Sequence, residues 1–228
     1  MGTLSKAIRP GLYAITDSWL TPGPELLSFV EAVLRGGAVL VQYRDKYATG
    51  PERLRQAQNL QSLCLNAQVP LIINDDAELA RRVGAAGVHL GQSDGSVAAA
   101  RRLLGETAII GVTCHSDLAL ARAAAEQGAD YLAFGRFFGS TTKPEAPAAD
   151  PSVLRHGREF GLPVTAIGGI TLDNGESLIR AGADMLAVVG GLFAGSPEHS
   201  EQRAQGFARL FRQHHPFFQY PDNRNPAP

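Results

Sequence analysis

The stretch Ala181-Gly182-Ala183-Asp184-Met185-Leu186-Ala187-Val188 is the part of the sequence that decides the fold. It is typical of the end of a helix, a glycine turn and a short apolar strand. A glycine after the last helical turn closes a helix well because it adopts the left-handed conformation without a steric penalty. Three earlier stretches repeat the pattern, at 35–41 (RGGAVLV), 83–90 (VGAAGVHL) and 127–134 (QGADYLAF). The copies lie about 45–55 residues apart, which is the length of two strand–helix units.

Four more short apolar runs alternate with these copies, at 11–15, 70–73, 108–112 and 163–167. Near-continuous apolar runs are typical of parallel strands that are buried on both faces. Eight strand–helix units in a chain of 228 residues favour a (β/α)8 TIM barrel, an α/β fold, over an open doubly wound sheet. Helices are expected at about 24–34, 51–65, 77–83, 96–104, 117–127, 151–160, 174–181 and 198–213.

The composition excludes several classes of protein. Charged residues make up 19% and the formal net charge is -1, which excludes a strongly basic nucleic-acid-binding surface. No apolar run approaches the roughly 18 residues of a membrane span, and residues 1–6 lack the apolar core of a secretory signal. Cys64 and Cys114 form neither a disulfide scaffold nor a zinc site, so we expect reduced thiols and a cytoplasmic location.

The barrel is expected to form a single domain over residues 1–213. The tail over 214–228 is rich in Pro, Asn and Gln and is expected to be loosely ordered or packed on the surface. Its aromatic residues Phe217, Phe218 and Tyr220 suit packing on the barrel or on a second subunit, so a homo-oligomer stays open.

Polar residues that follow the second expected strand form a candidate anion site. In a TIM barrel, function lies where the strands end and the following loops begin. Because strand side chains alternate between faces, Gln42, Arg44 and Lys46 point the same way, toward the barrel mouth. One amide and two cations would suit an anion. The alternative is a solvated strand end in which the cations pair with Asp45.

Two carboxylates after the next strands form a candidate metal site. Asp75 follows the third strand and Asp94 follows the fourth, and neighbouring strands lie only about 5 Å apart. Mg²⁺ is typically held by one or two carboxylates, with water and substrate phosphate completing its shell. The alternative is that each Asp caps a helix, which explains Asp76 better than Asp75 or Asp94.

Glycine-rich loops follow the last three strands. The run 135–143 (GRFFGSTTK) combines glycines, hydroxyls and Lys143, and could wrap an oxyanion with backbone N–H groups. Gly168-Gly169 and Val189-Gly190-Gly191 occupy the recurrent phosphate position of such barrels. The alternative for 135–143 is a surface loop without a ligand, and the alternative for the later glycines is that they only form tight turns. Of the two nearby histidines, we interpret His89 as structural, while His115 is a candidate acid or base.

The sequence resembles the thiamine-phosphate synthase family, whose barrel is shared with thiazole tautomerase. Each matching segment is weak alone, but in this order they are specific and span about residues 11–195. They are 41–46 (VQYRDK), 73–75 (IND), 87–94 (GVHLGQSD), 111–113 (GVT), 142–143 (TK) and 167–170 (IGGI).

The resemblance implies a transferase of thiamine biosynthesis with small-molecule substrates. It would join 4-amino-2-methyl-5-pyrimidinylmethyl diphosphate to a thiazole phosphate, releasing thiamine phosphate and diphosphate. In the family the C–O bond to the diphosphate breaks first, and the thiazole nitrogen captures the pyrimidinyl cation. Asp75 and Asp94 would hold Mg²⁺, and Arg44, Lys46, Lys143 and Thr113 would be catalytic. Substrate binding is expected from Gln42, Arg44, Lys46, Asn74, Thr113, Ser140, Thr142, Lys143, Gly169, Val189 and Gly190.

Two rival hypotheses stay open at the level of sequence. A thiazole tautomerase would need a proton shuttle, for which His115 is the candidate, and no Mg²⁺ or diphosphate residues. A non-catalytic barrel that binds a phosphate ligand is conceivable because Asp76 and Gly190 stand where the family often has Arg and Ser. The joint presence of the cations, Asn74 and both carboxylates favours the synthase.

Overall fold

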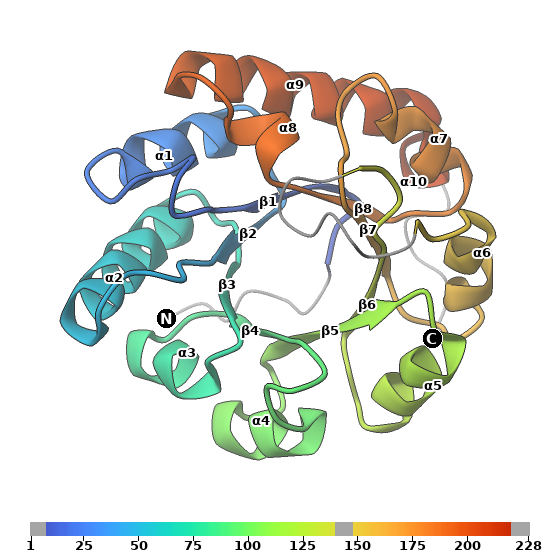
Figure 1. Cartoon of the computed structure of the whole chain (residues 1–228), viewed down its shortest axis with the longest axis horizontal. Helices are drawn as coiled ribbons and strands as arrows, with labels where there is room; N and C mark the ends of the chain where they lie inside the picture. The colour runs from blue at the N-terminus through green and yellow to red at the C-terminus, as the bar shows by residue number, and fades with distance from the viewer. Residues whose placement is uncertain (1–7, 140–147, 220–228) are drawn as a thin grey trace.

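Eight parallel strands form a closed barrel in the order β1 to β8. The computed structural model describes residues 8–139 and 148–219 of the chain. Each strand pairs with its neighbours in sequence, and β8 pairs with β1 through Tyr13 opposite Ala187. Figure 1 shows the helices as a ring outside the strands. The predicted (β/α)8 TIM barrel is confirmed, and the open sheet is excluded because the β1–β8 pairing closes it.

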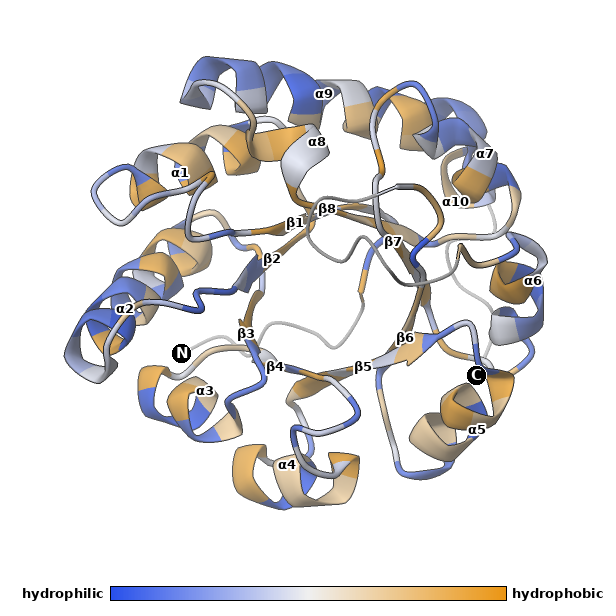
Figure 2. Ribbon diagram, viewed as in Figure 1, coloured by the Kyte–Doolittle hydropathy of each residue, from blue (hydrophilic) through white to orange (hydrophobic). Residues whose placement is uncertain are grey.

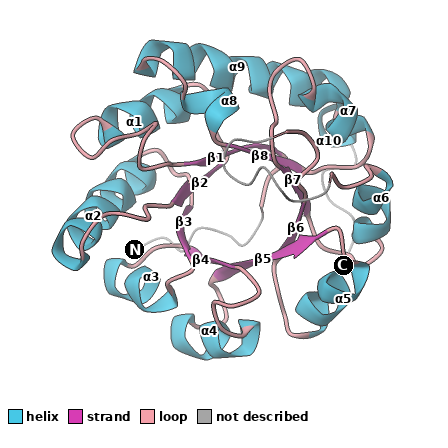
Figure 3. Cartoon of the chain, viewed as in Figure 1, coloured by secondary structure: helices cyan, strands magenta, loops and turns pink. Residues whose placement is uncertain are grey.

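The elements follow the alternation that the sequence predicts, as Figure 3 shows. The strands are β1 (Gly11–Ile15), β2 (Leu40–Tyr43), β3 (Leu71–Asn74), β4 (Gly87–Leu90), β5 (Ile109–His115), β6 (Tyr131–Phe134), β7 (Val164–Ile167) and β8 (Met185–Val188). The helices are α1 (Leu26–Arg35), α2 (Gly50–Asn66), α3 (Ala77–Val83), α4 (Val97–Leu104), α5 (Leu118–Glu126), α6 (Ser152–Arg158), α7 (Gly175–Arg180), α8 (Gly190–Phe193), α9 (Pro197–His214) and α10 (Pro216–Gln219).

Three elements differ from the sequence prediction. Strand β5 was expected to end at residue 112 but continues to His115, with a register shift between Thr113 and His115. Polar residues in this extension hid it from a search for apolar runs. The short helices α8 and α10 were missed because each is a single turn of four residues, too short for a helical period to be visible.

The repeated glycine turn closes the helices as expected. Gly182 has φ +114°, and the N–H groups of Gly182 and Ala183 donate to the carbonyls of Ile179 and Leu178. This pair of bonds satisfies carbonyls at the end of α7, and the positive φ strains any residue with a Cβ. The same turn recurs after α1, α3 and α5, where Gly37, Gly84 and Gly128 also have positive φ.

Apolar side chains form one layer inside the barrel and another between the strands and the helices. Tyr13, Leu40 and Tyr131 belong to the inner layer, whereas Phe29 and Phe193 belong to the outer one. Strand side chains alternate between the two layers because successive residues point to opposite faces. In Figure 2 the strands are mostly hydrophobic, whereas hydrophilic residues gather on the helices and loops around them.

Two aspartates brace the amino-terminal end of the barrel. Asp130 Oδ2 accepts the Ile110 N–H at 2.8 Å and pairs with Arg101 at 2.6 Å. Asp184 repeats this arrangement with the Val164 N–H at 2.8 Å and Arg158 at 2.8 Å. Each aspartate directly precedes its own strand and thereby fixes the start of the strand before it.

The tail begins on the surface of the barrel. The His215 imidazole lies 3.3 Å from Asp184, and α10 follows with the rings of Phe217 and Phe218 5.0 Å apart and partly exposed. Residues 216–219 form the short helix α10, whose side chains are exposed, while Tyr220 lies outside the described residues. Within the described parts of the chain, none of the helices is long and apolar enough to span a membrane.

Candidate active site

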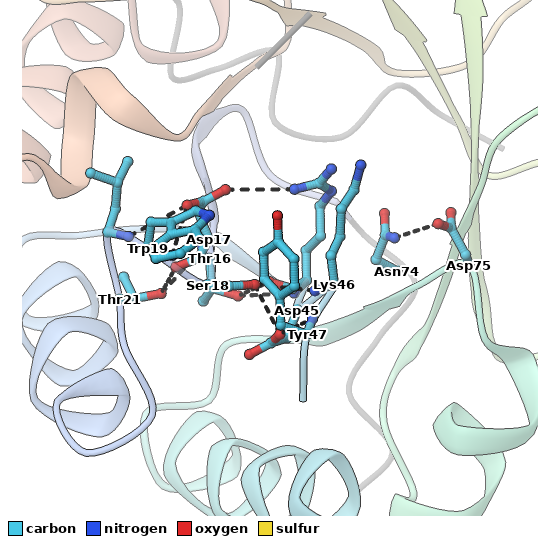
Figure 4. A network of polar contacts seen from close by, with 12 residues as sticks. Thr16, Asp17, Ser18, Trp19, Thr21, Asp45, Lys46, Tyr47, Asn74 and Asp75 are labelled. Atoms are coloured by element: carbon cyan, nitrogen blue, oxygen red, sulfur yellow. Dashed lines mark hydrogen bonds and ion pairs between the residues drawn. The ribbon is translucent and has the colours of Figure 1, made fainter. Parts of the chain in front are cut away.

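The β1–α1 loop holds the end of β2 at the barrel mouth. The Arg44 backbone N–H donates to Thr16 Oγ1 at 2.9 Å, and the same hydroxyl donates to the Arg44 carbonyl at 3.1 Å. The Arg44 guanidinium lies 3.7 Å from Asp17, and both side chains are largely buried. Arg44 therefore pairs with Asp17, which the sequence interpretation missed, rather than with Asp45. Figure 4 shows Thr16 and Asp17 in this network.

Asp45 shapes the loop after β2. Its Oδ1 accepts hydrogen bonds from the Ser18 hydroxyl at 2.8 Å and from the N–H groups of Tyr47 and Ala48 at 2.7 and 2.9 Å. Burial raises the pKa of Asp45, but these hydrogen bonds outweigh it and leave the pKa below its usual value. The Lys46 N–H donates to Ser18 Oγ at 3.1 Å, and the Lys46 side chain is exposed at the mouth.

Asp75 and Asp94 lie against each other at the ends of β3 and β4. Partial burial, the charge of Asp94 and a hydrogen bond between the two carboxyl groups raise the pKa of Asp75. Asn74 Nδ2, 2.6 Å from Asp75 Oδ2, and the Arg44 charge act in the opposite direction. Asp75 and Asp94 therefore form a carboxylate pair at the ends of β3 and β4, as the sequence predicted from strand spacing, and Arg44 follows the neighbouring strand β2.

Neither carboxylate is a helix cap. Asp76 accepts the Leu79 N–H at 2.8 Å and caps α3, whereas α4 is capped by Ser96. Asp75 instead adopts a left-handed conformation, with φ +62°, that aims it across at Asp94. The interpretation of Asp76 as a cap is confirmed, and the capping alternative for Asp75 and Asp94 is wrong.

The carboxylate pair fits a magnesium ion. Two like charges held together in partial burial repel each other unless a proton or a cation lies between them. No group of three or more His, Cys, Asp or Glu side chains that could hold a metal occurs in the described ranges. Two carboxylates suit Mg²⁺ because it keeps several waters and takes substrate phosphate oxygens as further ligands.

Arg53 of α2 braces the turn that carries Asp75. Its guanidinium lies 3.2 Å from Asp76 Oδ2 and donates to the Asn74 carbonyl at 3.4 Å. The sequence placed Arg53 in a helix but offered no signal that the side chain reaches the neighbouring strand end. Asp76, which stands where the family often has Arg, is thereby neutralised by Arg53.

A chain of hydrogen bonds crosses the barrel interior below the mouth. Gln42 Nε2 donates to Tyr13 OH at 2.6 Å, and Tyr13 OH lies 2.8 Å from Tyr131 OH. Tyr131 OH lies 2.8 Å from His89 Nδ1, and His89 Nε2 lies 2.9 Å from Thr113 Oγ1. Burial lowers the pKa of His89 to about 4, so the imidazole is neutral at physiological pH. The chain connects two predicted substrate-binding residues, Gln42 and Thr113.

The loops after β6, β7 and β8 approach one another through glycines. A Cβ built on Gly169 would lie 2.3 Å from the Gly139 carbonyl, and one on Gly191 would lie 2.1 Å from the Ile170 carbonyl. Asn174 holds the loop after β7 by donating to the Gly169 carbonyl at 3.0 Å. Val189 and Gly190 lie at the start of α8, where the first backbone N–H groups have no partner within the helix.

The structure places the predicted residues in two groups. Gln42, Arg44, Lys46, Asn74, Asp75, Asp94 and Thr113 lie at or just below the ends of β2 to β5, and Gly169, Val189 and Gly190 lie after β7 and β8. Ser140, Thr142 and Lys143 fall outside the described residues. His115 is exposed at the end of β5.

Comparisons with known proteins agree with this geometry. A family model described as thiamine monophosphate synthase matches residues 12–192. A thiamine-phosphate synthase of Marinobacter nauticus is 65% identical over 218 residues, which cover 96% of this chain and 98% of that protein. A solved thiamine phosphate pyrophosphorylase from Pyrococcus furiosus has a TM-score of 0.80 at 29% identity, covering 93% of this chain and 98% of that one. A pyrophosphorylase structure from Bacteroides thetaiotaomicron, with a TM-score of 0.67 at 15% identity over 90% of this chain and 99% of that one, is similar in fold.

Proposed function

The chain belongs to the thiamine monophosphate synthase family, and from that premise we propose how its barrel carries out the reaction. The activity is that of a thiamine-phosphate synthase, a transferase, rather than of a tautomerase or a non-catalytic binding barrel. The substrates we propose are 4-amino-2-methyl-5-pyrimidinylmethyl diphosphate and a thiazole phosphate. The observation that carries the proposal is the gathering of Arg44, which Thr16 and Asp17 hold in place, and of Asp75 and Asp94 at the ends of β2, β3 and β4.

Two cations that follow β2 bind the diphosphate in this proposal. Arg44 and Lys46 contact its oxygens, and Asn74 and Gln42 help to hold the pyrimidine diphosphate. Asp75 and Asp94 would hold Mg²⁺, which when bound would supply positive charge beside the diphosphate leaving group. The exposed Lys46 side chain and the mutual repulsion of the two carboxylates support this arrangement. Lys143, outside the described residues, is proposed on its sequence position alone to grip the diphosphate.

The reaction is a substitution at the methylene carbon of the pyrimidine. The C–O bond breaks and its electron pair leaves with the diphosphate, and the thiazole nitrogen then supplies the pair for the new C–N bond. Arg44 is oriented beforehand by Asp17 and Thr16. A pre-oriented cation stabilises the growing negative charge without reorganisation during the reaction. Thr113 contributes its hydroxyl beside the pyrimidine.

The acceptor binds on the side of β7 and β8. We assign its phosphate to the backbone around Gly169, Val189 and Gly190, where the loops approach each other without side chains. Backbone N–H groups at the start of a helix favour an anion. Ser140 and Thr142 approach the thiazole in this proposal, again on their sequence position alone.

The experiment that tests the proposal measures product formation directly and asks whether it depends on Mg²⁺. Purified protein is incubated with both substrates, with Mg²⁺ or with EDTA, and thiamine phosphate is quantified by mass spectrometry. We expect product that requires Mg²⁺. Product that forms equally well in EDTA would overturn the metal assignment, and folded protein without product would overturn the substrate assignment.

Arg44→Met tests the diphosphate site, with Arg55→Met as its matched control. Arg44 is largely buried at the mouth, whereas Arg55 is exposed on α2 and pairs with Glu52. We expect Arg44→Met to lower kcat/KM by about 100-fold or more, the range seen when one charge-stabilising group is removed. Arg55→Met should keep full activity. Equal activity of the two variants would remove Arg44 from the site.

The remaining assignments concern the whole chain. We propose that residues 1–213 form one domain with 214–228 as its tail, and that the protein acts in the cytoplasm. A homo-oligomer is proposed through the aromatic tail, where Phe217 and Phe218 are partly exposed. Sedimentation of the wild type and of a variant with serine at both positions tests this, and an unchanged oligomeric state would exclude that surface.

A further inference from the structure

The hydrogen-bond chain inside the barrel joins five polar side chains from five strands. Tyr13, Gln42, His89 and Tyr131 are buried, and only Thr113 is partly exposed. The four links measure 2.6 to 2.9 Å. Polar groups buried at this depth are costly unless every one is paired. The chain is therefore a defined structural feature rather than a chance set of contacts.

The backbone makes room for this chain. A Cβ built on Gly111 would lie 1.9 Å from Cζ and 2.3 Å from the hydroxyl oxygen of Tyr131. The Tyr131 ring stacks on His89 with centroids 5.6 Å apart and meets the edge of Tyr13 at 5.9 Å. Because Gly111 on β5 has no side chain, the Tyr131 hydroxyl has room to lie between Tyr13 and His89.

Counting hydrogens gives the chain a direction. Each hydroxyl has one hydrogen and a neutral imidazole has one N–H, so every hydrogen in the hydrogen-bond chain is paired only when each inner member donates once and accepts once. Gln42 Nε2 can only donate, and it donates to Tyr13. Tyr13 must then donate to Tyr131, and Tyr131 must donate to His89 Nδ1.

This direction determines which hydrogens stay available at the two ends of the hydrogen-bond chain. His89 receives a hydrogen at Nδ1, so its own hydrogen lies on Nε2 and is donated to Thr113 Oγ1. The Thr113 hydroxyl has accepted this bond, so its hydrogen is available to a ligand. Gln42 donates one hydrogen of Nε2 to Tyr13 and keeps its second N–H and its Oε1 for a ligand.

We propose that His89 is a positioning residue that makes Thr113 a hydrogen-bond donor toward the ligand. A ligand atom that matches this donor is an acceptor, such as a ring nitrogen of a 4-aminopyrimidine. The oxo form of a 4-hydroxypyrimidine presents a ring N–H at that place instead, which would leave the Thr113 hydrogen unpaired. The inference rests on the proposed function in one respect, that Gln42 and Thr113 contact the pyrimidine.

The first test determines the direction of the hydrogen-bond chain and does not depend on enzyme activity. The ring nitrogens of His89 are observed by ¹⁵N NMR in histidine-labelled protein at neutral pH, and are assigned by their loss in His89→Gln. We expect the neutral tautomer with hydrogen on Nε2. A hydrogen on Nδ1, or a mixture of the two tautomers, would overturn the inference. Failure of the synthase assay in the wild type would instead contradict the proposed function and leave this measurement intact.

The second test cuts the chain at one hydroxyl. Tyr131→Phe keeps the ring and removes the link between Tyr13 and His89. We expect KM for the pyrimidine diphosphate to rise about tenfold, the effect of one lost hydrogen bond, with a smaller change in kcat. Discrimination against the 4-hydroxy analogue should fall by a similar factor, and the NMR signal of His89 should become a mixture of tautomers.

Tyr43→Phe is the matched control. Tyr43 is equally buried and donates to Gln56 at 2.7 Å, but it lies in the outer layer and outside the chain. We expect it to lose some stability while KM, discrimination and the tautomer of His89 stay as in the wild type. Equal changes in KM and discrimination for Tyr131→Phe and Tyr43→Phe would mean that burial alone matters, and the inference would fail.

Discussion

Two pairs of aspartates, one pair at each end of the barrel, are held in opposite ways. At the amino-terminal end, Asp130 and Asp184 each accept a backbone N–H and pair with an arginine. At the carboxyl end, burial and the neighbouring Asp94 raise the pKa of Asp75. The first pair stabilises the fold, whereas the second is held at an electrostatic cost. Groups with perturbed pKa values gather at functional sites for this reason, so the contrast supports our proposal that Asp75 and Asp94 serve the reaction while Asp130 and Asp184 serve the fold.

Asp94→Asn should produce the largest effect, because it removes a carboxylate from the end that we assign to Mg²⁺. The asparagine can still accept the Gly91 N–H, which the aspartate accepts at 2.9 Å. We expect kcat/KM to fall by more than about 100-fold, as when one charge-stabilising group is lost. Thermal stability should stay equal or rise, because a like-charge contact is relieved. Steady-state kinetics and thermal unfolding measure the two effects.

Asp173→Asn is the control for that variant. Asp173 is an exposed carboxylate in the loop between β7 and α7, and we expect its removal to change neither activity nor stability. A large loss of stability in Asp94→Asn, in step with its loss of activity, would show that Asp94 is structural. The two ends of the barrel would then not differ in the way described.

Asp184→Asn should have the reverse signature. It removes the charge that faces Arg158 at 2.8 Å and lies 3.3 Å from His215. We expect a loss of about 1–3 kcal/mol in the free energy of unfolding, the cost of disrupting a partly buried hydrogen-bonded charge. Activity at a temperature well below the transition should stay within about twofold of the wild type. Urea unfolding and steady-state kinetics on the same sample measure the two effects. A loss of activity without a loss of stability would contradict the comparison.

The pH dependence of stability should distinguish Asp75 from an ordinary carboxylate. Its folded-state pKa lies above the ordinary value of 3.8, so the ionised form weakens the folded state at neutral pH. In EDTA, the wild type should gain stability relative to Asp75→Asn as the pH falls from neutral through that raised pKa toward 3.8. Melting temperatures of both proteins across this range measure the difference.

The same melting temperatures measured with Mg²⁺ added test whether Asp75 binds the cation. A cation that binds ionised carboxylates should raise the melting temperature of the wild type at neutral pH and lose this effect as the pH falls. Asp75→Asn should respond weakly at every pH. A difference between the two proteins that grows in the opposite direction, with the wild type losing stability on acidification, would mean that Asp75 is stabilised in the fold.

The barrel could be predicted from the sequence because its signals are local. The glycine turn before each of several strands needs a positive φ, as at Gly182, and apolar alternation fixes which side chains point inward. The proximity of Asp75 and Asp94 could also be predicted, since they follow neighbouring strands and parallel strands end at the same face. Both inferences need only the chain order and the spacing between strands.

Long-range polar partners could not be predicted in the same way. Arg53 reaches Asp76 from α2, and Tyr13 meets Tyr131 across 118 positions of sequence. The sequence interpretation gave His89 a structural role, yet its contact with Thr113 ties it to the mouth. Such contacts depend on where side chains of different strands point inside a closed barrel, and no local pattern records that.

Asp17→Asn should give the smallest effect, because it alters a partner of the site rather than the site itself. Asp17 Oδ1 accepts the N–H groups of Trp19 at 3.0 Å and Leu20 at 3.4 Å, while its Oδ2 lies 3.7 Å from Arg44. The asparagine keeps the turn but removes the charge that competes with a bound anion. We expect pyrophosphate to bind about two- to fivefold more tightly, in line with the modest strength of a long ion pair.

Trp19 supplies the measurement, and Asp117→Asn supplies the control. Trp19 is the single tryptophan of the chain and lies 5.5 Å from Tyr47, so its fluorescence can follow a pyrophosphate titration at the mouth. Asp117 accepts the N–H groups of Ala119 and Leu120 in a similar turn at the start of α5, and its replacement should leave the affinity unchanged. Weaker binding in Asp17→Asn would mean that Asp17 mainly orients Arg44. Asp17 would then join Asp76, which accepts a backbone N–H and pairs with Arg53, as a stabilising aspartate at the carboxyl end of the barrel.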